Sequence, residues 1–239
     1  MLNLDQQNWW RDQYRIAHPG WRPATEVFAA RVDASLQPQA RLLDVGCGRG
    51  GLIEQLGHPV HLVTGIDPDL PSLREHRLAG LPRAAASSDR LPFVDGSFDI
   101  VTAAWLLEHL ENPLVTFSSI CRILRPGGKF IFITPNSRHP LAFANRVAGR
   151  FGRLQAGLVN RIYDRAPDDT FPTFYRANSP QSLANQLTQS GMAIDSLEFV
   201  ADPTYLAFNK LAFRVMSALD EILTTDRRIH IIGVARKVV

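Results

Sequence analysis

Short apolar runs alternate with amphipathic stretches along most of the chain. Apolar runs bounded by glycine, proline or aspartate are typical of buried strands, and amphipathic stretches between them are typical of helices that cover a sheet. This repeated order predicts βαβ units, and therefore an α/β fold with a doubly wound, mostly parallel sheet. Seven strands are expected, at residues 41–45, 60–66, 83–86, 98–103, 129–134, 194–200 and 229–235.

Helices are expected in the amphipathic stretches between and after these strands. One of them, at 114–124, is followed by Arg125-Pro126-Gly127-Gly128, a basic last turn and then residues that break helices. Another begins at Ser179-Pro180, where serine can cap the helix and proline fits its first turn. Further helices are expected at 51–56, 70–79 and 205–223, after an N-terminal helical arm that carries Trp9, Trp10, Tyr14 and Trp21.

The composition fits one large folded domain, or one domain with a small cap. Of the 239 residues, 45% are apolar and 21% are charged, which excludes a disordered or collagen-like chain. The two cysteines, Cys47 and Cys121, are too few for a disulfide-stapled secreted scaffold and fit a reduced, intracellular chain. No signal peptide and no run of about 18 apolar residues is visible, so a cytoplasmic protein is expected.

The strongest local signal is the glycine-rich turn LLDVGCGRGG at 42–51, which follows the first strand. Such a turn lets a ligand approach the backbone at the carboxyl end of a strand, where open α/β sheets bind ligands. The glycines fit two patterns, GxGxG through Gly50 and the dinucleotide fingerprint GxGxxG through Gly51. Asp44 favours the first pattern, because a carboxylate facing the pocket would repel a pyrophosphate and attract a ligand with an amino group and a sulfonium.

Asp67 directly follows the second strand. At this spacing after a glycine turn an acid can bind both hydroxyl groups of a ribose. The alternative is a solvated turn acid beside Pro68. The glycine turn and the strand order together favour the ribose.

Four blocks of the chain resemble, in the same order, the motifs of class I S-adenosylmethionine-dependent methyltransferases. They are LLDVGCGRGGLIEQL, GIDPD, LPFVDGSFDIVTAAWLLEHLENP and RILRPGGKFIFITPN, and together they cover about residues 40–136. Within the family the chain is most similar to the ubiquinone-biosynthesis O-methyltransferase type, which shares LEH after the fourth strand and TPN after the fifth. The resemblance implies the Rossmann-like class I methyltransferase fold and S-adenosylmethionine as the cofactor.

The chain is expected to consist of four parts. These are an N-terminal helical arm at 1–36, a cofactor-binding Rossmann-like core at 37–136, an inserted basic helical lid at 137–178, and the C-terminal part of the core at 179–239. The aromatic residues of the arm could close over the acceptor, or they could equally be core residues of a docking helix.

The family's cofactor contacts fall on matched positions of this chain. The turn would hold the methionine and ribose parts of the cofactor, and the acid after the second strand would bind the ribose diol. Cys47 would be a small filler beside the cofactor, and Trp105 would line the sulfonium or pack in the core. The positions assigned to the methionine and ribose are Asp44, Gly46, Gly48, Gly50 and Asp67.

Adenine recognition departs from the family pattern. Relatives often place an acid four residues before LPF, but here that position is Ser87. Either the Ser87 hydroxyl or Asp89 in a shifted loop would bind the adenine amino group, with the backbone at Ser88 contributing.

Some relatives bind a divalent metal through an ExxEH pattern and a downstream histidine. In this chain Trp105 replaces the first acid, and the aromatic stretch at 171–175 contains no histidine. Glu108 and His109 alone would make a poor site for a hard cation. No catalytic metal is therefore expected.

Methyl transfer from a sulfonium is an in-line displacement that depends mainly on alignment and on exclusion of water. An oxygen acceptor such as a phenol would gain from a general base. His109, just past the fourth strand, is the first candidate, and His139 after the fifth strand is the second. The alternative for His109 is a structural histidine, hydrogen-bonded to Glu108 or to backbone.

Residues 138–165 hold six arginines and one acid, whereas the whole chain carries a net charge of only +3. Within 141–162 apolar residues recur at helical spacing beside a stripe of arginines, although three glycines weaken the pattern. This segment could be a lid helix with its arginines in water, or a contact with an anionic membrane surface that gives access to a lipophilic acceptor. The resemblance adds weight to the membrane, since ubiquinone-type enzymes carry an insertion here and act on prenylated phenols. A nucleic-acid partner is not expected, because only Phe151 and Tyr163 could stack on bases.

The expected function is methyl transfer from S-adenosylmethionine to a small-molecule or lipid-like acceptor, with oxygen favoured as the acceptor atom. One alternative is a catalytically silent cofactor-binding partner that regulates another enzyme, although Asp44 and Asp67 argue against it. The other is a nicotinamide-dependent oxidoreductase, which the overlap with GxGxxG allows.

Overall fold

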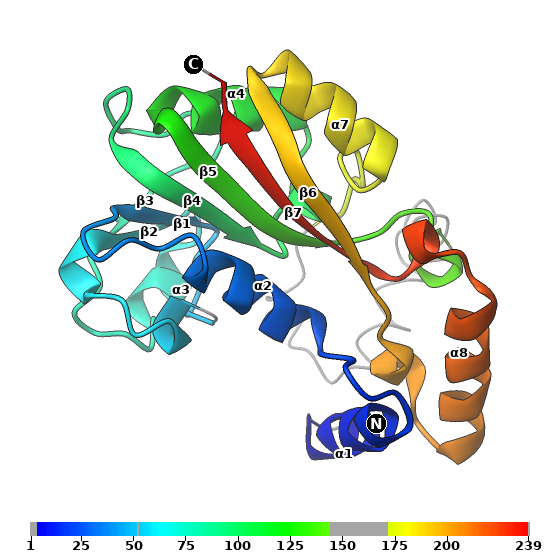
Figure 1. Ribbon diagram of the computed structural model, residues 1–239. Helices are drawn as coiled ribbons and strands as arrows, with labels where there is room; N and C mark the ends of the chain where they lie inside the picture. Colours follow the sequence, from blue (N-terminus) through cyan, green and yellow to red (C-terminus); the bar gives the residue numbers. More distant parts are fainter. Residues whose placement is uncertain (1–3, 52, 144–171, 239) are drawn as a thin grey trace.

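The computed structural model describes residues 4–51, 53–143 and 172–238, and in these residues seven strands form one sheet (Figure 1). The strand order is β3-β2-β1-β4-β5-β7-β6. Neighbours from β3 to β5 are parallel, and β7 lies antiparallel between β5 and β6. The predicted doubly wound, mostly parallel seven-stranded sheet is therefore confirmed. The strands are β1 (Leu42–Val45), β2 (Val63–Asp67), β3 (Arg83–Ala85), β4 (Phe98–Ala104), β5 (Leu124–Pro135), β6 (Met192–Val200) and β7 (His230–Lys237).

Helices cover both faces of this sheet, and each face has its own apolar core (Figure 1). On one face α4 (Pro113–Ile123) and α7 (Pro180–Gln189) pack together over Phe130 and Phe132 of β5. On the other face α2 (Ala24–Asp33) packs over Ile131 and Ile133 of the same strand. This alternation follows from the strand, whose successive side chains point to opposite faces. α3 (Leu70–Arg74) lies beside β2 and β3.

A third group of elements lies at the edge of the sheet where β5 and β6 end and β7 begins (Figure 1). It consists of α1 (Leu4–Ala17), α8 (Lys210–Ile222) and the 3-10 turn η5 (Pro203–Leu206). Trp10 of α1 stacks on Phe213 of α8 with ring centroids 4.5 Å apart. Trp10 and Tyr14 are buried, which fits core residues of a docking helix, whereas Trp9 is exposed.

Several predicted elements have different bounds. The helix expected at 51–56 is only a 3-10 turn, η1 (Ile53–Gln55), within a segment bounded by Gly51 and Gly57. The helix expected at 70–79 ends at Arg74, because the His76 side chain accepts the N–H of Leu78 and so competes with a helical hydrogen bond. The helix expected at 205–223 begins only at Lys210, capped by Asn209.

The predicted lid at 137–178 lies largely outside the described residues, and so does nearly all of the basic helix expected at 141–162. Among the helices of the described residues, none has the length and apolar character needed to cross a membrane.

Candidate functional site

Three glycines of the turn after β1 have backbone conformations that favour glycine. Gly46, Gly48 and Gly50 have φ values of +78°, +50° and +95°. Gly51 has no such φ, and a Cβ there would meet nothing within 4 Å in the described part of the chain. The backbone therefore follows the GxGxG pattern, and nothing in its local geometry requires the third glycine of the dinucleotide fingerprint.

The neighbours of this turn come close to it. A Cβ on Gly46 would lie 3.2 Å from Cδ1 of Leu106, the second residue after β4. A Cβ on Gly50 would lie 1.8 Å from Oε1 of Glu54 in η1. Side chains at these positions would make the Leu106 and Glu54 side chains shift, and the left-handed backbone is the main reason for glycine here.

Asp44 lies one residue before the end of β1, at the base of the turn. The Thr102 hydroxyl of β4 donates a 2.8 Å hydrogen bond to its Oδ1. Burial raises the pKa of Asp44 to about 6, partly offset by this hydrogen bond, and the negative charges of Asp67 and Glu54 raise it further. Three carboxyl groups thus act on one another around the glycine turn.

Asp67, the last residue of β2, is tied to the turn from the neighbouring strand. The N–H of Gly48 donates to Oδ2 at 2.9 Å, and the N–H of Asp69 donates to Oδ1 at 2.8 Å. The parallel register of β1 and β2 brings Val45 opposite Ile66, so the ends of the two strands lie side by side. Asp44 and Asp67, predicted from separate motifs, are therefore brought together.

Glu54 was not predicted as a site residue. Its Oε1 is buried without a hydrogen-bond partner among the described residues and faces Gly50. Its sequence signal was a lone acid in an expected helix, which by itself is typical of a solvated surface. Together with Asp44 and Asp67 it gives the surroundings of the glycine turn a negative character that suits a ligand carrying an amino group and a sulfonium, and opposes a pyrophosphate.

The segment expected to recognise adenine lies just after β3. The Thr116 hydroxyl of α4 donates to Oδ1 of Asp89 at 2.7 Å and lies 3.4 Å from the Ser88 hydroxyl. The Ser87 hydroxyl accepts the N–H of Asp89 at 3.4 Å. Ser87 and Asp89 are both exposed at the same edge of the sheet as Asp67. Their roles in adenine binding remain predictions.

The Cys47 side chain points from the turn toward Gly65 of β2. Its Sγ would lie 2.8 Å from a Cβ on Gly65, so the thiol fills the space above that glycine. Burial, followed by the charges of Asp44 and Asp67, raises the pKa of Cys47 to about 12, which keeps the thiol protonated at neutral pH. This placement suits a small filler and not a nucleophile.

Trp105 directly follows β4 and has a left-handed backbone with φ of +56°, an uncommon conformation for a bulky residue. Its ring packs edge-on against His230, the first residue of β7, with centroids 5.0 Å apart. Leu106, not Trp105, is the neighbour of Gly46. Contact of Trp105 with a sulfonium remains a prediction.

His109 lies in the 3-10 turn η3 (Leu107–His109) and is partly buried. Its Nδ1 donates to the carbonyl oxygen of Pro172 at 2.8 Å, since a carbonyl can only accept. The carbonyl oxygen of Glu108 also accepts the N–H groups of Phe174 and Tyr175. This arrangement fits a structural histidine that joins η3 to 172–175, and a catalytic role for His109 remains a prediction.

The Glu108 side chain is buried, and its Oε2 accepts the Thr134 hydroxyl at 3.1 Å. Burial raises the pKa of Glu108 to about 7. Within the described residues no three histidine, cysteine, aspartate or glutamate side chains are grouped so that they could hold a metal ion. The expectation of metal-free catalysis remains a prediction, and turnover that continues in EDTA would support it.

His139, the second candidate base, is fully buried after the end of β5. Its Nε2 lies 3.7 Å from Oδ1 of Asp220 in α8. His230 is buried close to both residues. Asp220 and His230 were not predicted, because each is isolated in sequence and only the fold brings them together.

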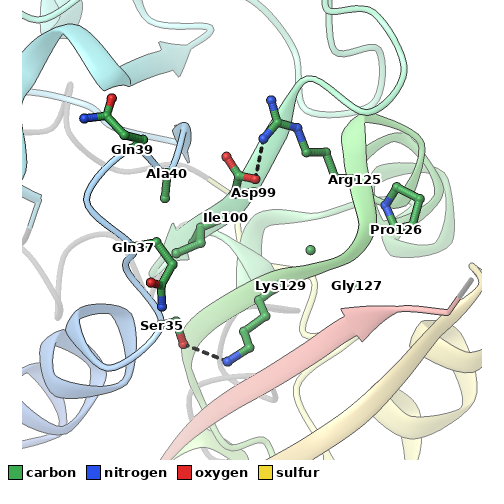
Figure 2. Close-up of a pocket in the computed structure, with 11 residues that line it drawn as sticks. Ser35, Gln37, Gln39, Ala40, Asp99, Ile100, Arg125, Pro126, Gly127 and Lys129 are labelled. Carbon is green, nitrogen blue, oxygen red and sulfur yellow. Dashed lines mark hydrogen bonds and ion pairs between the residues drawn. The ribbon is translucent and has the colours of Figure 1, made fainter.

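A pocket of about 410 Å³ opens at the opposite edge of the sheet, where β4 and β5 begin (Figure 2). Two of its lining residues, Arg125 and Asp99, form an ion pair with 2.6 Å between Nη1 and Oδ1, and the Lys129 ammonium donates to the Ser35 hydroxyl at 3.3 Å (Figure 2). None of the predicted site residues lines this pocket. Parallel α/β sheets bind ligands at the carboxyl ends of their strands, so the glycine turn remains the candidate site.

Known proteins share this sequence pattern. A family model described as a methyltransferase domain matches residues 43–132. A ubiquinone biosynthesis O-methyltransferase of Xanthomonas oryzae pv. oryzae is 38% identical over 131 residues, which are 52% of this chain and 53% of that protein. The chain thus spans about half the length of that relative. The corresponding protein of Xanthomonas axonopodis pv. citri is 37% identical over 174 residues, which are 70% of this chain and 68% of that protein.

Solved structures share the fold. A methyltransferase of Mesorhizobium loti is similar with a TM-score of 0.60 at 23% identity, over 90% of this chain and 98% of that one. The [4+2]-cyclase SpnF is similar with a TM-score of 0.59 at 21% identity, over 90% of this chain and 80% of that one. At these identities the likeness concerns the fold alone. Together with the glycine turn and its flanking acids, the sequence relatives show that this chain belongs to the class I S-adenosylmethionine-dependent methyltransferase family.

Proposed function

We propose that this protein transfers a methyl group from S-adenosylmethionine to a hydroxyl group of a small-molecule or lipid-like acceptor. The observation that carries the proposal is the convergence of Asp44, Asp67 and Glu54 around the left-handed glycines of the turn. Asp44 would hold the amino group of the donor, and Asp67 its ribose hydroxyls. When bound, the donor supplies an activated methyl group, and the protein's part is to align the acceptor and exclude water.

Oxygen as the acceptor atom is supported by the sequence relatives, which are named ubiquinone biosynthesis O-methyltransferases. Their names describe an O-methylation in ubiquinone biosynthesis. We therefore propose a phenolic hydroxyl as the acceptor group for this chain.

The first test is ligand protection against thermal unfolding, with S-adenosylhomocysteine compared with NAD. A ligand at 100 times its Kd adds about 2.7 kcal/mol, which raises the melting temperature by roughly 5–10 °C for a chain of this size. We expect the rise with S-adenosylhomocysteine and none with NAD. Protection by NAD alone would contradict the proposal and favour a nicotinamide-dependent oxidoreductase.

Asp67→Ala provides the matching variant. We expect a loss of S-adenosylhomocysteine affinity of about ten-fold or more, the scale of a lost hydrogen bond to a charged group. Asp195→Ala is the control, because Asp195 is a surface acid of β6 that pairs with Arg236. Equal affinities of the Asp67→Ala variant and the unmodified protein would remove Asp67 from the donor site.

A second candidate function is donor binding without methyl transfer. It is favoured by one observation, namely that a [4+2]-cyclase shares this fold, so the fold alone does not determine the reaction. Tight binding of S-adenosylhomocysteine without methylation of any compound in a broad panel of phenols, catechols, amines and carbon acids would favour it. Transfer of labelled methyl from S-adenosylmethionine to a phenol would exclude it.

We also propose that the basic segment at 141–162 contacts an anionic membrane surface and gives access to a lipophilic acceptor. The support is the sequence pattern, with apolar residues and arginines at helical spacing. We expect flotation with vesicles containing phosphatidylglycerol at low salt and loss of flotation at high salt, because salt screens surface charge. Absence of flotation at both salt concentrations would favour a lid with solvated arginines.

A further inference from the structure

Asp220 of α8 is a buried carboxyl group that has no hydrogen-bond donor in the described part of the chain. Its side chain is 1% exposed, and neither carboxyl oxygen has a hydrogen-bond partner among the described residues. Asp202, the buried acid that precedes η5, does have donors. Its Oδ1 accepts both the N–H and the hydroxyl of Thr204. Buried polar groups nearly always have a partner, so the condition of Asp220 requires an explanation.

His139, in the segment after β5, lies opposite Asp220 of α8. Its Nδ1 accepts the N–H of Leu141 at 3.2 Å, which places the ring hydrogen on Nε2 in the neutral imidazole. Nε2 is also buried without a hydrogen-bond partner in the described part of the chain, and it lies 3.7 Å from Oδ1 of Asp220. That separation is too long for a hydrogen bond. A buried donor and a buried acceptor thus face each other without bonding.

The hydrogen-bonding capacity of this pair suits a hydroxyl group. A single oxygen near both atoms could accept from Nε2 of His139 and donate its hydrogen to Oδ1 of Asp220. A hydroxyl group has both capacities, whereas an ammonium could only donate and a carboxylate could only accept.

The pair lies at the same edge of the sheet as the donor site. His139 follows the end of β5, and the chain runs from α8 through the 3-10 turn η6 (Thr225–Arg227) into β7 (Figure 1). A series of contacts leads from the donor site toward the Asp220–His139 pair. Leu106 borders Gly46, and its neighbour in the chain, Trp105, packs on His230. His230 in turn lies within electrostatic range of His139 and Asp220. Burial lowers the pKa of His230 to about 4, so at neutral pH it is uncharged.

We infer that Asp220 and His139 form the site for the reacting hydroxyl of the acceptor, with Asp220 as the group that takes its proton. The inference rests on the proposed function and assigns catalytic residues to it. Nε2 of His139 donates to the acceptor oxygen and orients it. As the oxygen forms its bond to the methyl carbon, the methyl–sulfur bond breaks and its electron pair stays on sulfur, while the hydroxyl proton passes to the Asp220 carboxylate. The Asp220 side chain is 1% exposed, so water does not compete with the acceptor hydroxyl for it.

The test uses catechol as the probe, because it is a soluble phenol. Asp220→Asn keeps the size of the side chain and removes the base, so we expect kcat/KM for catechol to fall at least about 100-fold. Glu221→Gln is the matched control, since Glu221 is an exposed acid at the next position of α8, and we expect its kcat/KM within two-fold of the unmodified protein. Both variants should bind S-adenosylhomocysteine with unchanged affinity.

Two measurements do not depend on turnover. Calorimetric titration of catechol into the complex with S-adenosylhomocysteine should show about ten-fold weaker binding to Asp220→Asn than to the unmodified protein. Asp220→Leu should raise the melting temperature by about 2–4 °C, because it removes a buried carboxyl group that has no donor.

Each outcome bears on one claim. Turnover of Asp220→Asn within three-fold of the unmodified protein, or equal affinity of both for catechol, would overturn the inference and leave the proposed function intact. A lowered melting temperature of Asp220→Leu would mean a structural role and would also overturn it. If the unmodified protein binds S-adenosylhomocysteine but methylates no phenol, the proposed function fails, and the catechol titration then decides the inference separately.

Discussion

At the scale of single residues, the site is governed by where carboxyl groups lie relative to solvent. Asp44 is buried beside one hydroxyl donor, and its pKa is raised to about 6, whereas Asp67 accepts two backbone N–H groups. Both acids could be recognised in the sequence, because each lies within a motif. Their environments could not, because Thr102 and Glu54 reach Asp44 only through the fold.

The raised pKa of Asp44 predicts that donor binding depends on pH. A ligand amino group prefers the ionised carboxylate, so acidification through pH 6 should weaken binding. We expect the affinity for S-adenosylhomocysteine, measured by calorimetry, to be up to about ten-fold lower at pH 5 than at pH 8. Asp44→Asn should bind weakly at both pH values with a flat profile. A pH-dependence that persists in Asp44→Asn would assign the effect to another group.

At the scale of elements, the pairing of β5 with β7 shows which features the sequence pattern predicts and which depend on the fold. Short apolar runs predicted both strands, and capping serine and asparagine fit the starts of α7 and α8. The sequence could not reveal that Gly233 lies opposite Phe132 in the antiparallel register, or that the Phe132 ring covers it. Register is a relation between two segments about a hundred residues apart, so neither segment contains it alone.

Gly233→Ala should destabilise the sheet at this crossing. An added Cβ would lie 2.1 Å from Cζ of Phe132, so the ring must move. We expect a cost of about 1–3 kcal/mol and a loss of roughly 2–4 °C in melting temperature for each kcal/mol. Phe132→Leu in the same chain should recover part of this loss.

Gly80→Ala is the control for that substitution, because the nearest atom to its Cβ would be 3.7 Å away. Its melting temperature should match that of the unmodified protein. An unchanged melting temperature of Gly233→Ala would show that the ring relaxes without cost.

At the scale of the whole molecule, stability and function make opposing demands at one edge of the sheet. Glu108 and Asp220 are both buried there, and burial of an acid costs folding free energy unless it is neutral or bonded. Proteins tolerate such costs at functional sites because the rest of the fold compensates for them. The cost at Glu108 can be measured through its dependence on pH.

Burial raises the pKa of Glu108 from 4.5 to about 7. Between these values the folded state binds the proton and the unfolded chain does not, so the free energy of unfolding falls as pH rises through this window. The stability that protonation of Glu108 contributes to the folded state is fully present below about pH 4.5 and is lost above about pH 7. A shift of this size corresponds to about 3 kcal/mol.

Glu108→Gln should therefore become more stable relative to the unmodified protein as pH rises. The difference, measured by urea unfolding, should be larger at pH 8 than at pH 4.5 by about 3 kcal/mol. Glutamine can still accept the Thr134 hydroxyl, so the hydrogen bond is kept. A difference that does not change with pH would mean that Glu108 is ionised at no cost in the folded protein.

The sequence by itself determined the class of fold and predicted the donor site, because both depend on short-range patterns. Short apolar runs, a glycine turn and the acids at the ends of two strands each lie within about ten residues, and local physical chemistry acts over that distance. The tertiary structure decided which glycine pattern the backbone follows, that Glu54 joins the donor site, and that Asp220 faces His139. Residues 139 and 220 meet only because β7 inserts antiparallel between β5 and β6, and no local pattern contains a strand order.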